Sequence, residues 1–268
     1  MSTTSPPSAA AETLCYHCFD ATIGIRAERN GLIGAVLDRL PPCWQPTVPG
    51  ETVDATIGLE RRNAPGALAG DTWTLLIDGR PILRSSDRTV IARAVEDALH
   101  VMVAAHSHRF VFVRAGVVRH RDRVILLPGA PGAGTTALVE ALVRCGAAYF
   151  SDAFAILDRE GGVHPYAVPL AARQPSDAPL KPLPAAGPCG IGVIACLRYG
   201  GPRSWHVSET SLEDTARALI AHTLFAHQTP ERTLRALSAA FTADAAALSG
   251  ERGEADEAAQ HLLALLDN

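Results

Sequence analysis

The chain has 268 residues, of which 47% are hydrophobic, so it is long and apolar enough to bury one large core or two smaller ones. Its formal net charge of −4 argues against a nucleic-acid partner, because binding to a phosphate backbone needs a concentrated basic surface. The sequence has neither an apolar run of about 18 residues nor a basic leader before an apolar segment, so we expect a cytoplasmic protein without a membrane partner.

The first part of the chain predicts a disordered tail followed by a small α+β region. Residues 1–13 are mainly Ser, Thr, Pro and Ala, too poor in large apolar groups to offset the entropy of ordering. Short β-type runs separated by Gly, Pro and Asp predict a mixed or antiparallel sheet, and they lie at residues 22–25, 53–59 and 73–77. Apolar residues then recur at three-to-four spacing over residues 87–105, which predicts an amphipathic helix. We assign residues 14–105 to this N-terminal region.

The cysteines and histidines of this region do not predict a metal site. Cys15 and Cys18 have the spacing of metal ligands, but no second pair of this kind follows, so buried free thiols are favoured over zinc. His100, His106 and His108 lie on the predicted helix or just after it. Histidines at a helix end more often cap carbonyl groups or face water than bind a metal, so we assign them no ligand.

From residue 106 onward the pattern changes to strand, glycine-rich turn and helix. The predicted strands lie at residues 110–113, 117–118, 123–127, 148–151, 154–157 and 163–170. A helix over residues 136–144 follows the glycine-rich turn and ends before Gly146. We therefore expect the second domain to cover residues 106–268.

The remainder of this domain should contain one more buried strand and three helices. The proline-rich stretch at residues 175–188 is either a plain connection or a mobile substrate-gating loop. A strand is predicted at residues 192–197, and Ser211 should cap a helix that runs to about residue 227. Thr229 and Pro230 predict the start of a second helix, and residues 252–266 predict a third.

Residues 129–136, with the sequence GAPGAGTT, match the phosphate-loop pattern G-x-x-x-x-G-K-[S/T] except at the lysine. The segment follows an apolar strand and opens a helix, so its backbone amides and the helix dipole should point at an anion. The alternative is a glycine-rich turn with no ligand. The residues assigned to nucleotide binding are Gly129, Gly132, Ala133, Gly134, Thr135 and Thr136.

Two positions of this loop determine what chemistry it predicts. Thr136 occupies the position whose hydroxyl ligates magnesium, whereas Thr135 stands where a lysine would contact the terminal phosphates. Losing a charge-assisted hydrogen bond of about 1.5–3 kcal/mol should weaken triphosphate binding roughly ten- to a hundredfold. The single lysine of the sequence, Lys181, lies far along the chain from this position.

Several ordered motifs give the second domain a resemblance to the HPr kinase-like family. Besides the loop, they are RAGV at 114–117, YFSDA at 149–153, VHPY at 163–166 and RGEAD at 252–256. The resemblance implies a P-loop fold of the HPr kinase/phosphoenolpyruvate carboxykinase type: an α/β mixed sheet with flanking helices, here preceded by the smaller α+β region. It covers about residues 112–268.

The resemblance also implies an activity, namely ATP-dependent phosphorylation of a serine hydroxyl on a protein, peptide or small molecule. The family's first acidic residue, which serves Mg²⁺ and the acceptor proton, corresponds to Asp152. The second acidic position is Ala153, and the histidine expected in the strand before the loop is Arg114. A guanidinium can contact phosphate bidentately, so Arg114 is assigned as the replacement cation and Lys181 as a weaker one.

The alternatives for these residues are structural. Asp152 would then cap the turn before Phe154, and Arg252 and Glu254 would form a solvent-exposed charge pair at a helix start, which we favour over a role in the site. Two functions follow from the sequence. One is an active kinase that uses ATP and Mg²⁺, and the other is a kinase-like protein that binds a nucleotide, phosphorylated ligand or partner peptide without turnover.

Overall fold

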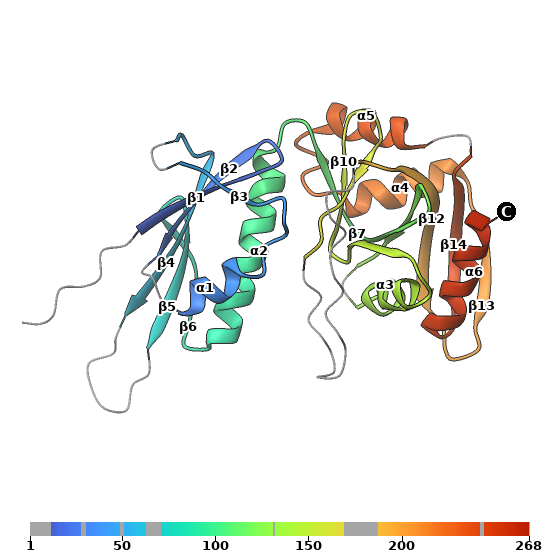
Figure 1. The fold of residues 1–268 in the computed structure, drawn as a ribbon, viewed down its shortest axis with the longest axis horizontal. Helices are drawn as coiled ribbons and strands as arrows, with labels where there is room; N and C mark the ends of the chain where they lie inside the picture. The colour runs from blue at the N-terminus through green and yellow to red at the C-terminus, as the bar shows by residue number, and fades with distance from the viewer. Residues whose placement is uncertain are drawn as a thin grey trace, which may run out of the picture. The chain divides into compact units, whose positions relative to one another are not determined.

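The computed structural model describes residues 12–27, 31–48, 51–62, 71–130, 132–168, 187–241 and 244–267. It is a mixed α/β protein with two mixed sheets, and its described residues form six helices (Figure 1). The chain divides into two compact units, Met1–His108 and Arg109–Asn268. Of the predicted disordered tail, residues 12 and 13 belong to a strand and the rest lie outside the described residues.

The first unit is a six-stranded sheet with two helices. The strand order is β3-β1-β2-β4-β5-β6, and all neighbours are antiparallel except β2 and β4. The strands are β1 (Glu12–Cys18), β2 (Ala21–Ala27), β3 (Gln45–Pro46), β4 (Ala55–Arg62), β5 (Thr72–Ile77) and β6 (Arg80–Ser85). The predicted mixed sheet is therefore present, and β6 was missed because it contains Pro81 and is largely exposed at an edge.

The helices α1 (Gly31–Leu37) and α2 (Arg88–His106) contact each other, and α2 packs on the sheet. The side chain of Asp87 caps α2 by accepting from the amides of Thr89 and Val90 at 2.8 and 3.3 Å. Buried residues recur along one face of α2, as its apolar periodicity predicted. Cys15 and Cys18 are buried in the same unit, and the Sγ of Cys18 lies 3.7 Å from that of Cys43.

The second unit contains an eight-stranded sheet in the order β11-β10-β7-β8-β12-β14-β13, with β9 also paired to β7. The strands are β7 (Val111–His120), β8 (Arg123–Pro128), β9 (Ala148–Ser151), β10 (Phe154–Leu157), β11 (Val163–His164), β12 (Gly190–Tyr199), β13 (Trp205–Glu209) and β14 (Ala246–Arg252). β12 is parallel to both β8 and β14. The ends of these three strands therefore lie at one edge of the sheet, which we call the carboxyl edge, and their beginnings lie at the amino edge.

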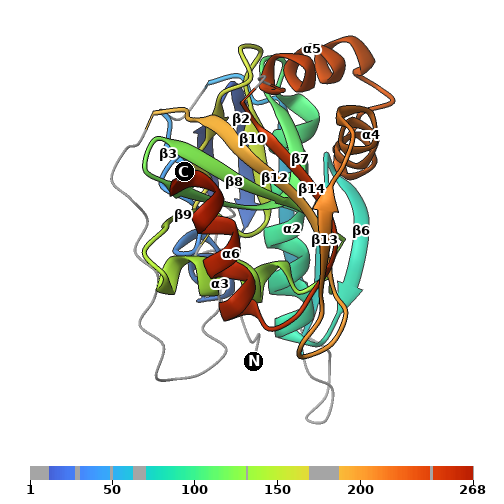
Figure 2. The same cartoon turned by 90° about the vertical axis from the view of Figure 1, so that its right-hand side faces the viewer.

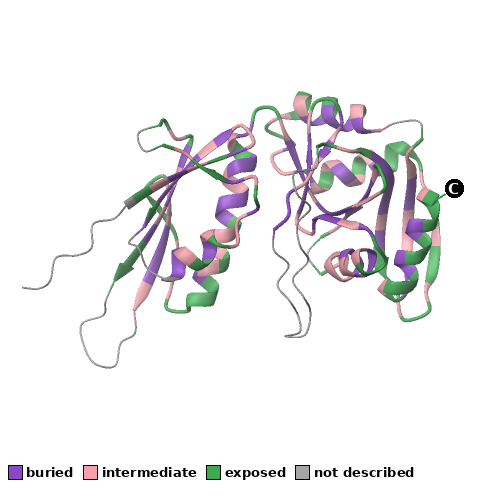
Figure 3. Cartoon of the chain, in the orientation of Figure 1, coloured by how far each residue is buried: buried purple, intermediate pink, exposed green. Residues whose placement is uncertain are grey.

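Helices cover both faces of this sheet. They are α3 (Thr135–Arg144), α4 (Leu212–His222), α5 (Pro230–Ala240) and α6 (Ala255–Asp267). Helices α3 and α6 lie side by side on one face, as Figures 1 and 2 show, whereas α4 and α5 cover the other. Figure 3 shows the buried residues in the strands between these layers.

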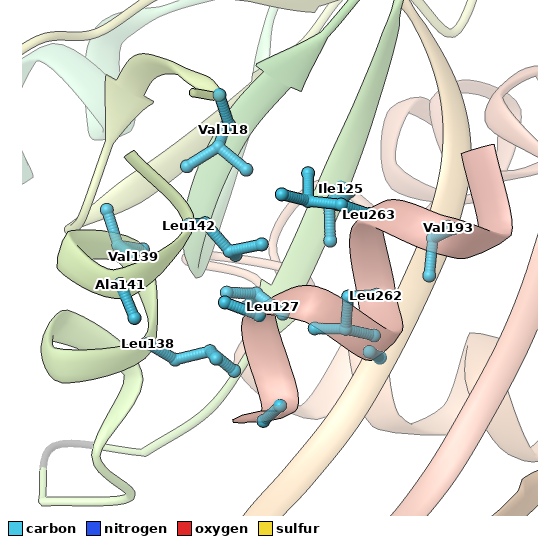
Figure 4. Packing of buried hydrophobic residues seen from close by; sticks show 14 of the residues in the cluster. Val118, Ile125, Leu127, Leu138, Val139, Ala141, Leu142, Val193, Leu262 and Leu263 are labelled. Carbon is cyan, nitrogen blue, oxygen red and sulfur yellow. The ribbon is translucent and has the colours of Figure 1, made fainter. Parts of the chain in front are cut away.

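The strand period of two divides the core between the two faces. Ile125 and Leu127 of β8 pack with α3 and α6, as Figure 4 shows, together with Leu138, Leu142, Val193, Leu262 and Leu263. Val124 and Leu126 of the same strand pack on the opposite side with Leu237 of α5. This alternation determines which side chains at the carboxyl edge share a face with α3.

Three predicted elements differ from the structure. The helix expected from residue 252 begins at Ala255, because residues 246–252 form β14 beside β12. The helix capped by Ser211 ends at His222 rather than at about residue 227, and the strand expected over residues 163–170 is described only at residues 163–164. Most of the proline-rich stretch lies outside the described residues.

Candidate phosphate-binding site

The loop between β8 and α3 has the backbone conformation that its glycines predict. Gly132 and Gly134 have φ angles of +91° and +80°, in the left-handed region that L side chains rarely adopt. The amide of Ala133 donates to the carbonyl oxygen of Ala130 at 3.1 Å. Pro131 lies outside the described residues. The segment is thus a tight turn that joins a buried strand to a helix at the carboxyl edge.

The start of α3 has no side-chain cap. Gly134 is the N-cap residue and has no side chain that could accept a bond from the first-turn amides. The first amides of a helix have no partner within it, and the helix dipole places partial positive charge at the same end. A phosphate group is the kind of ligand that satisfies both.

Close packing brings this helix end down onto the sheet. A Cβ atom at Gly116 of β7 would lie 2.5 Å from Cγ2 of Val139 and 2.7 Å from Cγ2 of Thr135, so this position requires glycine. A Cβ at Gly129 would lie 2.8 Å from Oγ1 of Thr135. The side chain of Thr135 therefore lies over the beginning of the loop, at the position where a lysine would start in a complete motif.

Asp152 lies near Thr136. It occupies the turn between β9 and β10, and the nearby Thr136 hydroxyl is one of the groups that lower the pKa of its carboxyl. The Tyr149 hydroxyl lies 3.0 Å from Oδ1 of Asp152 and 2.6 Å from the carbonyl oxygen of Val168. The Tyr149 hydroxyl thus contacts both the Asp152 carboxylate and the backbone of Val168. Tyr149 was part of the resemblance but had no predicted role.

The environment of Asp152 changes its acidity. Burial raises the pKa of its carboxyl above the ordinary value, the hydrogen bond from Tyr149 opposes this, and the charge of Glu140 raises the pKa further. Glu140 lies one helical turn after Thr136 on α3, so it is a second acidic residue that the sequence analysis did not assign. A carboxylate with a raised pKa is a better proton acceptor than an exposed one.

The alternative that Asp152 caps the turn before Phe154 is wrong. The Ser151 side chain performs this function, since its Oγ accepts from the amides of Ala153 and Phe154 at 3.2 and 3.0 Å. The Asp152 carboxylate instead contacts the Tyr149 hydroxyl.

Arg114 lies at the same edge and on the same face as the loop. Its strand neighbour Ala115 pairs with Pro128, the last residue of β8. Arg114 is two residues from Gly116, which faces α3, and strand side chains alternate between faces. Its guanidinium carbon lies 5.6 Å from the centre of the Phe154 ring. The predicted replacement cation thus lies on the strand paired with the one that leads into the loop, with its guanidinium over a ring and without a described contact to the loop.

The interpretation of Arg252 as part of a solvent-exposed charge pair is wrong. Only 3% of the residue is accessible to solvent. Its Nη2 donates to the carbonyl oxygen of Gly134 at 2.9 Å, and its Nη1 donates to that of Gly253 at 2.7 Å. Burial lowers the pKa of Arg252, yet a guanidinium remains protonated in proteins. Its charge is therefore fixed against the loop backbone.

Other features considered from the sequence are Lys181, metal-binding groups, membrane-spanning helices and His100. Lys181, the weaker replacement cation, lies outside the described residues. Within the described ranges, no three His, Cys, Asp or Glu side chains form a metal-binding group, and no helix is long and apolar enough to cross a membrane. His100 is buried on α2, and burial lowers its pKa to about 4.

No family model matches the chain, and no curated protein shows significant similarity to it.

Proposed function

We propose that this protein is an ATP-dependent kinase-like phosphotransferase that phosphorylates a serine hydroxyl on a protein, peptide or small molecule. The observation that supports it most is the juxtaposition of an uncapped helix start, two left-handed glycines and the Thr136–Asp152 pair. In this proposal residues 106–268 form an HPr kinase/phosphoenolpyruvate carboxykinase-like fold, and the protein acts in the cytoplasm.

The phosphates of ATP would lie against the amides of residues 132–136. The missing lysine leaves a deficit of positive charge, and two arginines at the carboxyl edge reduce it. Arg252 places its charge behind Gly134, to which it is hydrogen-bonded. Arg114 stands on the adjacent strand with its guanidinium over Phe154, and a guanidinium can contact a phosphate bidentately.

The oxygen ligands at this edge fit Mg²⁺. This ion is usually held by one or two carboxylates together with substrate phosphates and water, rather than by an all-protein cage. Thr136 and Asp152 would supply one hydroxyl and one carboxylate oxygen. When bound, the ion would neutralise charge on the phosphates of ATP.

Asp152 would also act on the acceptor. Its raised pKa favours uptake of the proton that a serine hydroxyl releases as it attacks the terminal phosphate, either directly or through a water molecule. Burial and the contact with the Tyr149 hydroxyl at 3.0 Å would hold this group in position.

A second candidate function is a kinase-like protein that binds a nucleotide, a phosphorylated ligand or a partner peptide without turnover. The observation in its favour is the identity of two side chains at the loop. The short Thr135 side chain occupies the position of the lysine, and Ala153 occupies the position of the second carboxylate. Binding through backbone amides needs neither group, whereas stabilising the charge of a transition state benefits from both.

Two measurements on the purified full chain separate these functions. Isothermal titration with ATP, with and without Mg²⁺, measures binding, and transfer of labelled γ-phosphate to serine-containing peptides and proteins measures turnover. The kinase proposal predicts Mg²⁺-dependent binding together with transfer to serine. Binding that is independent of Mg²⁺ and without transfer supports the second candidate, and the absence of any nucleotide or phosphate binding would contradict both.

A further inference from the structure

Tyr199 is an exposed aromatic side chain close to the phosphate loop. It is the last residue of β12, the parallel strand next to β8, and 51% of its surface is accessible to solvent. The residue paired with it on β14 is Arg252, which is hydrogen-bonded to Gly134 of the loop. A single arginine side chain therefore separates the loop backbone from the Tyr199 ring.

The strand period places the ring on the loop side of the sheet. Val193, Ala195 and Leu197 of β12 pack into the core beneath α3 and α6. Tyr199 follows Leu197 by two residues, so its side chain leaves the sheet on this same face. On β8, Leu127 packs into the same core just before the loop begins.

The ring is held in position from two sides. The guanidinium carbon of Arg252 lies 5.7 Å from the ring centre, a cation–π contact. The Tyr199 hydroxyl donates to Oε1 of Glu254 at 3.0 Å. These contacts orient the ring of a half-exposed residue, and an oriented, accessible aromatic ring is the feature on which planar bases stack.

We propose that Tyr199 is the stacking platform for the base of a nucleotide whose phosphates occupy the loop at residues 129–136. This inference rests on the proposed phosphate site and adds the residue that recognises the rest of the ligand. Arg252 then has two roles as a positioning residue, because it fixes the loop through Gly134 and the platform through the ring.

The test compares two ligands, ATP and inorganic triphosphate, which share the phosphate chain but not the base. Both are titrated with Mg²⁺ into the full-length protein and into the Tyr199→Ala, Tyr199→Phe and Trp205→Ala variants. Trp205 is the neighbouring control: it pairs with Arg252 from β13, whereas Tyr199 pairs with it from β12, and its ring stacks on His261 at 4.3 Å between centroids. Thermal unfolding of each variant verifies that it is folded.

Removing the ring in Tyr199→Ala should weaken ATP binding about tenfold and leave triphosphate binding unchanged, because base–aromatic stacking contributes only to ATP. Tyr199→Phe keeps the ring and should retain ATP affinity close to that of the unmodified chain, as should Trp205→Ala. Unchanged ATP affinity in Tyr199→Ala, or an equal loss of both ligands, would overturn the stacking role while leaving the phosphate site intact. If the unmodified chain binds neither ligand, both the proposed phosphate site and the proposed stacking role of Tyr199 are wrong.

Discussion

Charged side chains at the two edges of the sheet in the second unit have different kinds of partners. At the amino edge, where β8 begins, ionisable groups pair with one another in water. Asp267 of α6 lies 2.9 Å from Nε2 of His120 and 2.6 Å from Nη2 of Arg121. Its side chain is 45% exposed, so these contacts compete directly with solvent.

At the carboxyl edge, three charged side chains use other partners. Arg252 donates to backbone carbonyl groups, Arg114 lies over an aromatic ring, and Asp152 contacts the Tyr149 hydroxyl. Exposed ion pairs such as those of Asp267 contribute about 0–1 kcal/mol to the free energy of unfolding, and the two charges of each pair already neutralise each other. Arg198 and Glu251 also pair at the carboxyl edge, at 2.7 Å, but Arg114, Asp152 and Arg252 take part in none of the ion pairs of the described residues, and we therefore propose that function lies at this edge.

The largest expected effect comes from Asp152→Asn, which keeps the shape of the side chain and removes its charge. If Asp152 accepts the serine proton, γ-phosphate transfer should fall about 10²–10⁴-fold, the usual contribution of a general base. Asp267→Asn, the same change at the amino edge, should leave transfer unchanged. Full transfer by Asp152→Asn would remove Asp152 from the mechanism.

Arg252→Met should produce the largest loss of stability among these variants. The change removes two hydrogen bonds from a charged donor and leaves the Gly134 carbonyl oxygen without one of its partners, so the free energy of unfolding should fall by about 2–4 kcal/mol. Chemical denaturation measures it. The matched change at the other edge, Arg121→Met, should cost no more than about 0.5 kcal/mol. Similar values for both would mean that Arg252 does not hold the loop.

Thr135→Lys restores the motif lysine and tests how much charge the loop lacks. Because charge-assisted hydrogen bonds contribute about 1.5–3 kcal/mol, affinity for ATP should rise about tenfold or more. Isothermal titration of the variant beside the unmodified chain gives the ratio. Unchanged affinity would show either that the loop binds no phosphate or that Arg114 and Arg252 already provide the charge, and triphosphate binding to the unmodified chain separates these cases.

The smallest expected effect is a pH shift caused by Glu140→Gln. Asp152 must be ionised to accept a proton, so transfer should rise with pH through its raised pKa. Glu140 contributes to that raised pKa, so removing its charge lowers the pKa and should move the rising part of the pH–rate profile to lower pH. A profile that does not move, or moves to higher pH, would show that Asp152 does not control the rate.

The elements predicted best are those whose signal is local. The apolar periodicity of α2 and the sequence of strand, glycines and helix around the loop place both features within a few residues of where they lie. The strand β14 could not be predicted in the same way, because AALSGER contains mainly small and polar residues with low β propensity. It becomes a strand by pairing in parallel with β12, which is a property of the fold and not of the segment.

The same limit applies to the site. The glycines and Thr136 belong to one contiguous motif, and Asp152 followed from its resemblance to a kinase motif. The roles of Tyr199, Arg252 and Glu140 depend on which strands are neighbours and on which face each side chain lies. Arg252 in particular was predicted to be an exposed helix-start residue. Its side chain is instead buried and donates to the carbonyl oxygen of Gly134, which is 118 positions away in the sequence.

The most direct test of the account is the response of backbone amides to a nucleotide, because the central claim is that amides at the start of α3 bind phosphate. Amide NMR shifts should be recorded for the full-length protein as ATP and Mg²⁺ are added. The largest changes should occur at Gly132, Gly134, Thr135 and Thr136. Saturable binding that leaves these four amides unmoved, or no binding at all, would contradict it.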